Sequence, residues 1–365
     1  MAATAVLAGP GLWVSSCARN LRAELMGPNP IADSLNPETW NILYHASFAP
    51  SGHNSQPWFV EIINENEWII GSDERRWLPR IDPTNREVML SLGAFIENLA
   101  QAAAVLGFHA DVQVIARDCF DSRIARVMLT RALPVDIPLD RLTQRRTVKT
   151  HLLPRELKTA DVSAFSEEVP GHLYYFPRGS SHSDHMAAEA MANFEHQFKN
   201  EGAVQETADW TRLSDKDARK FRDGLTTEGM EITGIAGWFV RNFMDRQDVM
   251  GANFRQKGIE KTIKQAGEGA GWLVITSDGK SVEALVECGR CFQRMALLAR
   301  DKMIGLHPMT QTLEEKAGQK NIRANHGPGT LPQFMIRVGY LDKYPDPVSL
   351  RRPVDWFLKS SGAIS

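Results

Sequence analysis

Two long segments with helical periodicity constrain the fold of this chain more than any other feature. Residues 82–108 and 281–306 both repeat apolar side chains at spacings of three and four, the period of a helix with one face in a core. Short apolar or alternating runs of strand type stand around both segments, at residues 58–63, 68–72, 110–116, 123–130, 172–176, 271–276 and 334–340. The pattern predicts a globular protein that mixes strands with two long core helices.

Two further segments break this pattern. Residues 307–315 follow the second long helix and are expected to form a loop before the last strand. Residues 226–258 are rich in glycine and aromatic residues but show no clean period, which indicates a mobile or covering segment.

The composition shows no global charge bias. The 365 residues include 42 Lys and Arg and 44 Asp and Glu, for a formal net charge of -2. This balance does not favour nucleic acid as a partner, so any basic site must be local. Four cysteines with one close pair make neither a disulfide framework nor a zinc pattern, and no metal site is expected. That pair, Cys288 and Cys291, lies on an apolar helix face, which favours buried small side chains over a redox-active pair.

Residues 1–20 are apolar and rich in small side chains. They resemble the apolar part of an export signal but lack a basic start, so a disordered or packed N-terminus is an equal alternative. The protein is accordingly expected in the cytoplasm, or exported to the periplasm or anchored to a membrane if the segment belongs to a signal. No later segment approaches the apolar length of about 20 residues that a membrane span needs.

The stretch HASFAPSGHNSQPWFVEI, residues 45–62, joins a helix to a strand through a polar loop. Its short donors and acceptors, its glycine and its two prolines suit a flat heteroaromatic ligand with polar edges. The alternative is a connection whose polar groups bond to their own backbone. The candidate binding residues in it are Pro50, Ser51, Gly52, Asn54 and Gln56.

A basic cluster occupies residues 141–149 and comprises Arg141, Arg145, Arg146 and Lys149. Taken alone, such a cluster favours a solvated helix end. The sequence contains no GxGxxG after a strand, no phosphate-binding GxxxxGK[ST] loop and no GxSxG elbow. The common dinucleotide, P-loop and serine hydrolase sites therefore lose their main support.

These motifs resemble those of the FMN-dependent nitroreductase family. Residues 49–58, APSGHNSQPW, resemble its APS-x-x-N-x-QPW signature, and residues 145–149, RRTVK, resemble its arginine-arginine-serine phosphate motif. Thr147 replaces the serine and Lys149 an arginine, which keeps a hydroxyl and a cation but loses the bidentate fork. Residues 287–306 resemble the family's long core helix, and residues 338–340 with 351–358 its last strand and tail. The resemblance runs from residue 35 to 357, with 220–260 poorly matched.

The order of the motifs is similar to that of the Acg-type branch, because the loop precedes the arginine motif. In that branch one chain carries two nitroreductase-like halves and imitates a homodimer. The resemblance implies an α+β, three-layer fold with a mixed central sheet flanked by long helices. Its halves would span residues 30–135 and 136–357, with a lid-like insertion at 220–260. The protein would be a monomeric pseudo-dimer or a weak homodimer.

The resemblance also implies one FMN per chain, at a site where the loop of the first half meets the arginine motif of the second. The phosphate would be bound by Arg145, Arg146 and Lys149 of the motif that includes Thr147, together with Arg351 or Arg352. The ring or ribityl chain would meet the opening loop, and the ring edge near N5 would meet Met309, Thr310 and Gln311.

The implied reaction is ping-pong hydride transfer from NADH or NADPH, through the flavin, to a small molecule such as a nitroaromatic or quinone. No protein acid or base is expected. One alternative is an FMN-dependent dehydrogenase or oxidase of one specific metabolite. Another is an FMN-binding or sequestering protein in which residues 220–260, through Trp238, Phe239 and Phe243, cover the flavin.

Overall fold

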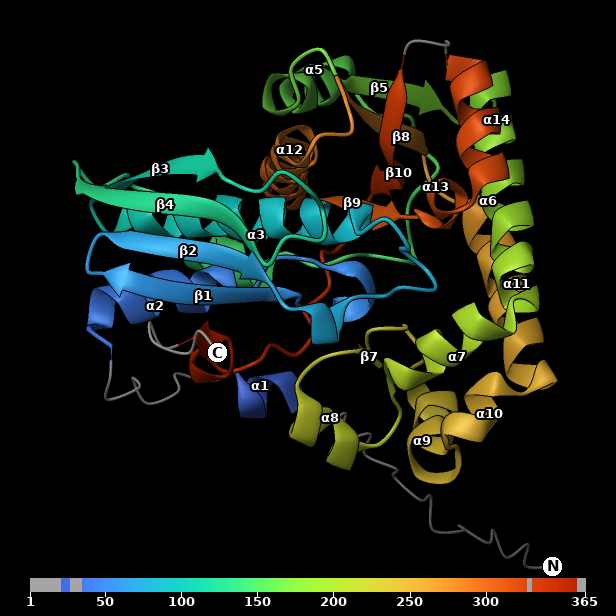
Figure 1. The fold of residues 1–365 in the computed structure, drawn as a ribbon. Helices are drawn as coiled ribbons and strands as arrows, with labels where there is room; N and C mark the ends of the chain where they lie inside the picture. The colour runs from blue at the N-terminus through green and yellow to red at the C-terminus, as the bar shows by residue number, and fades with distance from the viewer. Residues whose placement is uncertain (1–20, 27–34, 327–329, 360–365) are drawn as a thin grey trace, which may run out of the picture.

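The computed structural model describes residues 21–26, 35–326 and 330–359. Two sheets lie on either side of a pair of long helices, so the layers run sheet, helix, helix, sheet (Figure 1). This arrangement confirms the α+β class with a mixed sheet, although the strands are divided between two sheets. The predicted signal-like or disordered segment at residues 1–20 lies outside the described residues.

The first sheet has five strands in the order β11-β1-β2-β4-β3. Its strands are β1 (Trp58–Asn64), β2 (Glu67–Ser72), β3 (Phe108–Val114), β4 (Arg123–Arg131) and β11 (Leu358–Lys359). β11 runs parallel to β1 and the other pairs are antiparallel, which makes the sheet mixed. Because β11 comes from the C-terminus, the end of the chain is tied to the strand that follows the opening loop.

The second sheet is antiparallel, in the order β5-β8-β10-β9. Its strands are β5 (Leu173–Pro177), β8 (Gly271–Ser277), β9 (Ile304–Pro308) and β10 (Leu331–Tyr340). The sequence analysis was wrong about the start of β9, because it continued the second long helix to residue 306. In the structure, Met303 takes a left-handed backbone conformation (φ 57°) and reverses the chain, and pairing with β10 begins at Ile304.

The two long helices are α3 (Arg86–Val105) and α12 (Val282–Asp301), and they touch through their backbones. An ideal Cβ on Gly93 would lie 2.0 Å from the carbonyl oxygen of Val286, and one on Gly289 would lie 2.1 Å from that of Leu90. Only glycine fits at such a crossing. The contact joins the apolar faces of both sheets into one continuous core.

α3 is, within the described residues, the one helix long and apolar enough to cross a membrane. The sequence analysis found no continuous apolar run of that length, because Glu97, Asn98 and Gln101 interrupt the apolar residues of α3. Its most apolar window is 78% buried inside the protein. The carboxylate of Asp82 begins the helix by accepting the backbone N–H groups of Glu87 (2.7 Å) and Val88 (3.2 Å).

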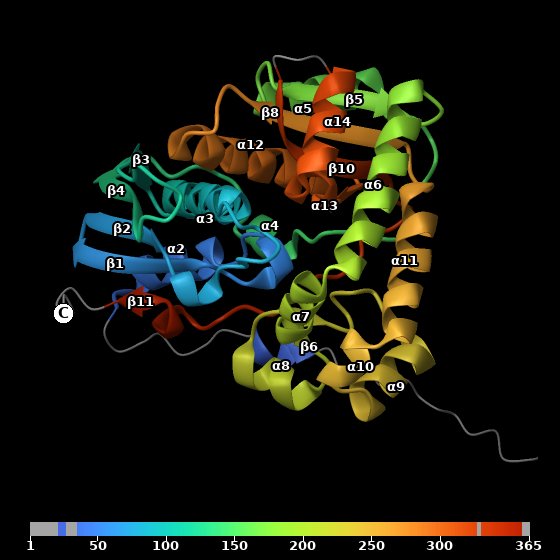
Figure 2. The same cartoon turned by 45° about the vertical axis from the view of Figure 1, so that its right-hand side comes forward.

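The remaining elements surround this core (Figures 1 and 2). They are α1 (Leu21–Leu25), α2 (Pro37–Ala46), η1 (Gly52–Asn54), η2 (Glu74–Arg76), α4 (Asp140–Gln144), α5 (Thr159–Glu168), α6 (Ser181–Lys199), α13 (Gln311–Glu314), α14 (Lys316–His326) and η3 (Val354–Trp356). The loop expected at residues 307–315 is thus partly strand and partly helix, because its first residues pair with β10.

Residues 201–266 form a further group of short elements. They are α7 (Glu201–Asp209), β6 (Thr211–Arg212), α8 (Asp215–Phe221), β7 (Leu225–Thr226), α9 (Gly234–Phe243), α10 (Arg246–Met250) and α11 (Ala252–Ala266). The sequence analysis was wrong to find no regular structure in residues 226–258. Several elements follow one another here with their own boundaries, for example the five-residue α10 with its capping box of Asp245 and Asp248, so no single period runs through the segment.

The cysteine pair of α12 is buried, as its position on the apolar face predicts. Cys288 and Cys291 are free thiols with 5% and 9% exposure. Burial raises the pKa of Cys291 to about 11 and that of Cys288 further, which leaves both protonated and unreactive at neutral pH.

Candidate functional site

One cavity of about 1600 Å³ brings together most of the residues singled out in the sequence. Its walls come from the opening loop, the basic motif, the chain after β9, the C-terminal tail, α6 and the helices of the 201–266 group. The predicted residues that line it are Pro50, Ser51, Gly52, Asn54, Arg145, Arg146, Thr147, Lys149, Met309, Thr310, Gln311 and Arg351. Gln56 and Arg352 do not line it.

The opening loop has an unusual backbone. His53, Asn54 and Gln56 have φ values of 49°, 53° and 52°, in the left-handed region that favours glycine. Each such non-glycine residue costs on the order of 1 kcal/mol, and the conformation persists only where the surroundings enforce it. Part of the enforcement is local, since the backbone N–H of Gln56 donates to Oγ of Ser51 at 2.9 Å.

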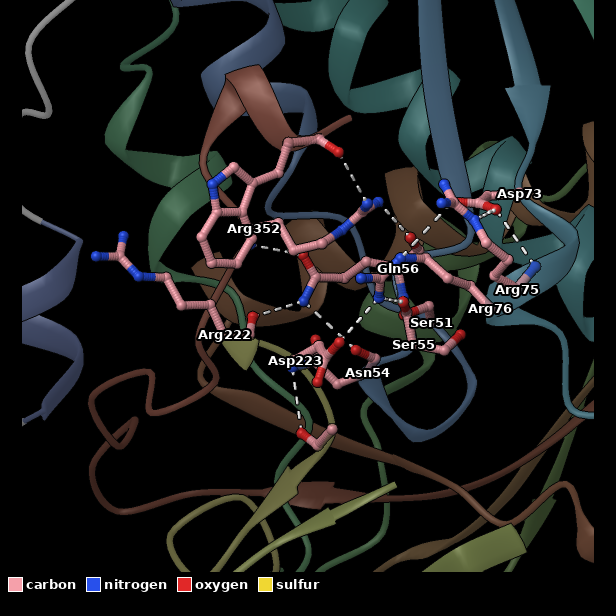
Figure 3. A network of polar contacts seen from close by, with 12 residues as sticks. Ser51, Asn54, Ser55, Gln56, Asp73, Arg75, Arg76, Arg222, Asp223 and Arg352 are labelled. Carbon is pink, nitrogen blue, oxygen red and sulfur yellow. Dashed lines mark hydrogen bonds and ion pairs between the residues drawn. The ribbon is translucent and has the colours of Figure 1, made fainter. Parts of the chain in front are cut away.

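The C-terminal tail provides most of the remaining constraint (Figure 3). Nη2 of Arg352 donates to the carbonyl oxygens of Gln56 (2.6 Å) and Trp58 (2.8 Å), and its backbone N–H donates to Oε1 of Gln56 (2.9 Å). These bonds correct the predicted roles of Gln56 and Arg352. A buried loop needs donors for its carbonyl groups, and both side chains serve the loop rather than the cavity.

Arg351 serves the loop and the cavity together. Its Nη1 donates to Oδ1 of Asn54 at 2.9 Å, and its Nη2 donates to the carbonyl oxygens of Phe48 and Ala49, both at 3.1 Å. Its Nε is buried without a hydrogen-bond partner, and its side chain lines the cavity. One edge of the guanidinium is therefore committed to the loop while Nε remains unpaired.

Residues 222–224 hold the other side of the loop (Figure 3). Nε2 of Gln56 donates to the carbonyl oxygen of Arg222 at 2.9 Å, and Nδ2 of Asn54 donates to that of Gly224 at 3.3 Å. Asp223 is fixed by ion pairs with Arg76 (2.9 Å) and Arg212 (2.8 Å). The start of the poorly matched 220–260 region is thus bonded directly to the loop that carries the best-matched motif.

Buried guanidinium groups that have no anionic partner among the described residues mark one end of the cavity. Arg145 is 7% exposed, burial lowers its pKa, and its Nε has no hydrogen-bond partner. Arg22 of α1 also lines this end and donates to the carbonyl oxygens of Thr143 and Ser349. Burying positive charge without a counter-ion is costly. This end of the cavity therefore suits a bound anion, and a phosphate above all.

The other half of the basic motif already has a carboxylate. Oε1 of Glu231 accepts from Nη2 of Arg146 at 2.9 Å and from the backbone N–H of Lys149 at 3.0 Å, and its Oε2 accepts from Oγ1 of Thr150 at 2.5 Å. Nζ of Lys261 donates to the carbonyl oxygen of Glu231 at 3.1 Å. The 220–260 region therefore inserts an acidic side chain into the motif predicted to bind phosphate.

Known proteins resemble this chain in sequence over most of its length. No protein-family model matches it. The probable NAD(P)H nitroreductase PigM of a Serratia species is 23% identical over 335 residues, which cover 85% of this chain and 90% of PigM. A putative NAD(P)H nitroreductase of Mycobacterium tuberculosis is 23% identical over 330 residues, 86% of this chain and 90% of that protein. The chain is homologous to these two proteins, which are named as a probable and a putative NAD(P)H nitroreductase.

Solved structures give weaker matches to this nitroreductase homologue. A nitroreductase-like family protein from Bacillus cereus aligns over 62% of this chain and 98% of its own, with 10% identity and a TM-score of 0.35. The FMN-dependent nitroreductase NfnB from Mycobacterium smegmatis, in complex with NADPH, aligns over 57% and 93%, with 12% identity and a TM-score of 0.34. With TM-scores this low, we base no inference on these two likenesses.

The cavity of this nitroreductase homologue also contains polar groups that the sequence analysis did not assign. They are Arg22, Glu87, Glu231, His307 and Glu314. Of these, Glu87 lies in the first long segment of helical periodicity and His307 opens the expected 307–315 loop, but neither position had been assigned a role. His307 was expected in a loop but lies in β9, where it is 8% exposed and its Nδ1 has no partner.

Proposed function

We propose that this chain is an FMN-dependent NAD(P)H oxidoreductase of the nitroreductase type, with the FMN phosphate at the Arg145 end of the cavity. The observation that carries the proposal is the buried Nε of Arg145, which lacks a partner in a cavity lined by the other motif residues. A phosphate there would supply the missing anion and accept charge-assisted hydrogen bonds. The homologues named NAD(P)H nitroreductases support the same assignment.

The chain's own residues would bind and orient the cofactor. Arg145, Arg22 and Arg351 would bind the phosphate, and the hydroxyl proton of Ser51 would be available to the ligand, because its oxygen accepts from Gln56. The backbone at residues 309–311 would line the ring edge. Bound FMN supplies the redox chemistry, taking a hydride from a nicotinamide donor and passing electrons to an acceptor.

The size of the cavity favours a two-stage reaction. Pockets for one drug-sized ligand hold about 300–1,000 Å³, whereas this cavity holds about 1600 Å³. An FMN would leave room for one further planar molecule beside it. We infer that the nicotinamide donor and a nitroaromatic or quinone acceptor occupy this space in turn, which gives ping-pong kinetics.

One observation favours a second candidate function, the sequestration of FMN. Glu231 bonds the 220–260 region to the basic motif, and Ile235, Phe239 and Val240 of α9 line the cavity. A region held in this way would cover a bound flavin and restrict the access of a second substrate. The two functions differ in whether NADH or NADPH reduces the bound flavin.

The test is an absorbance spectrum of the purified protein, followed by anaerobic addition of NADH and then NADPH. Oxidised-flavin bands that bleach support the oxidoreductase, and bands that persist support sequestration. Arg145→Ala should weaken flavin binding about 10- to 100-fold, since a hydrogen bond to a charged group contributes about 1.5–3 kcal/mol. Arg141→Ala is the control, because Arg141 pairs with Asp301 (2.6 Å) and does not line the cavity. A protein without flavin bands even after addition of FMN would refute both functions.

A further inference from the structure

Two carboxyl groups lie next to each other in the wall of the cavity. Glu87 belongs to the first turn of α3, and Glu314 is the last residue of α13; both line the cavity. A side-chain hydrogen bond joins them. Two carboxylates cannot share a hydrogen bond unless one of them carries a proton, so the pair stores one exchangeable proton inside the cavity.

The surroundings assign that proton to Glu314. Glu87 has a cation, because its Oε1 accepts from Nη2 of Arg86 at 3.0 Å. The partners of Glu314 apart from Glu87 are neutral: Oε1 accepts from Oγ1 of Thr310 at 3.2 Å, and Oε2 accepts from the amide of Gln197. Burial and then Glu87 raise the pKa of Glu314 well above its ordinary range, while Gln197 and Arg86 oppose the shift.

Two more titratable groups approach the pair. Asp82 caps α3 beside Glu87, and its pKa is raised to about 6 by burial and by the charge of Glu87. His53 of the opening loop faces Glu87, and burial lowers its pKa to about 4. The pKa values of His53 and Asp82 both lie below neutral pH, whereas the pKa of Glu314 is raised well above its ordinary range. Neither group therefore takes the proton from Glu314.

The position of the pair connects it with the reacting end of the proposed cofactor site. Glu314 ends the short helix α13 that begins at Gln311, next to residues 309–311, which would line the ring edge. Oε2 of Glu87 lies beside the opening loop, 3.2 Å from an ideal Cβ on Gly52. Unpartnered buried atoms of Arg145 (7% exposed) and His307 (8% exposed) line the same cavity, which independently indicates a ligand there.

We propose that Glu314, hydrogen-bonded to Glu87, is a catalytic residue that donates a proton to the electron acceptor bound in this cavity. This inference rests on the proposed oxidoreductase function. Reduction of a quinone to a hydroquinone takes one hydride, which the nicotinamide donor supplies by way of the flavin, and one proton. The O–H bond of Glu314 breaks, an O–H bond forms on the quinone oxygen, and the resulting carboxylate recovers its proton from water.

The first experiment measures the proton itself, in protein as purified and after saturation with FMN. At about pH 8, where ordinary carboxyl groups and also Asp82 with its pKa of about 6 are ionised, infrared difference spectra should show a protonated-carboxyl band. Glu314→Gln should remove the band. The control Glu315→Gln should keep it, because Glu315 does not line the cavity and pairs instead with His196. A wild-type protein without the band, or a band that survives in Glu314→Gln, would overturn the proposal.

The second experiment separates the two half-reactions by stopped flow, with NADPH as donor and benzoquinone as acceptor. Glu314→Gln should leave flavin reduction unchanged and slow reoxidation by benzoquinone about 100-fold, since general acid catalysis contributes about 10²–10⁴. Glu87→Gln removes a like charge and should move the pH profile of reoxidation to lower pH without abolishing it. Equal reoxidation rates in wild type and Glu314→Gln would refute the role of Glu314 as proton donor and leave the proposed oxidoreductase function standing. Failure of the wild type to bind or reduce flavin would refute the proposed function, and with it this inference.

Discussion

The contact of Glu231 with the basic motif predicts how firmly the 220–260 region is held over the cavity. Glu231→Gln keeps the shape of the side chain and one carbonyl acceptor, but it removes the negative charge. The wild-type carboxylate accepts three hydrogen bonds, one of them from the guanidinium of Arg146, and both side chains are only 10–11% exposed. Solvent therefore screens this ion pair weakly.

The magnitude follows from those bonds. A hydrogen bond to a charged group contributes about 1.5–3 kcal/mol, and a neutral one about 1 kcal/mol. Converting the three bonds to neutral ones should cost about 2–3 kcal/mol, which makes opening of the region about 30- to 150-fold more frequent. Amide hydrogen exchange measures this directly, because exchange of residues 226–243 follows the local opening equilibrium.

A matched control lies in the same region. Glu228 pairs with Arg241, but these side chains are 36% and 26% exposed, so Glu228→Gln should change the opening by no more than about 1 kcal/mol. Unchanged exchange in Glu231→Gln, or equal acceleration in both variants, would contradict the reasoning. Faster uptake of FMN by Glu231→Gln would show in addition that this carboxylate competes with the phosphate.

Three further predictions concern the fold and the loop. Gly93→Ala should lower the melting temperature, because its Cβ would lie 2.0 Å from a carbonyl oxygen. Such overpacking costs about 1–3 kcal/mol, which exceeds the roughly 1 kcal/mol that alanine gains in helix propensity. Gly267→Ala is the control, because the nearest atom to its Cβ would be 3.7 Å away. Arg352→Gln should lower the urea midpoint, because two loop carbonyl groups lose a donor at about 1–3 kcal/mol each. Burial lowers the pKa of His53 from 6.5 to about 4 in the folded protein. As the pH falls, His53 is therefore protonated first in the unfolded chain, so the free energy of unfolding decreases between pH 6.5 and pH 4. His53→Asn, which tolerates the left-handed backbone, should flatten the melting temperature across that range.

The sequence revealed those parts of the molecule that have a long period or a specific motif. The strands β1, β2, β3, β4, β5, β8 and β10 and the two long helices were predictable because apolar residues repeat along each of them. The helices of residues 234–266 were not, because three separate helices with different faces follow one another and no single period runs through the segment. The predicted end of the second long helix at residue 306 was wrong for another reason. Residues from Ile304 onward pair with β10, although the helical pattern continues in the sequence.

The same division holds for the candidate site. The opening loop and the basic motif could be found because they are contiguous and resemble a known signature. Arg22, Glu231 and Glu314 come from segments with no periodicity or motif of their own, and only tertiary structure brings them to the cavity. Whether the chain consists of two nitroreductase-like halves, as its motif order predicts, stays a prediction.

The polar side chains of the opening loop can hydrogen-bond to protein and still shape a ligand site, so the two interpretations of this loop do not exclude each other. The side chains of Asn54 and Gln56 bond to protein, yet their partners lie in the C-terminal tail and at residues 222–224 rather than in the adjacent backbone. These long-range bonds hold three non-glycine residues in left-handed conformations. A loop fixed in advance loses little entropy when it binds a ligand. It follows that the polar residues of the signature contribute to binding chiefly by shaping the backbone, and that the tail which ends in β11 is required for the site.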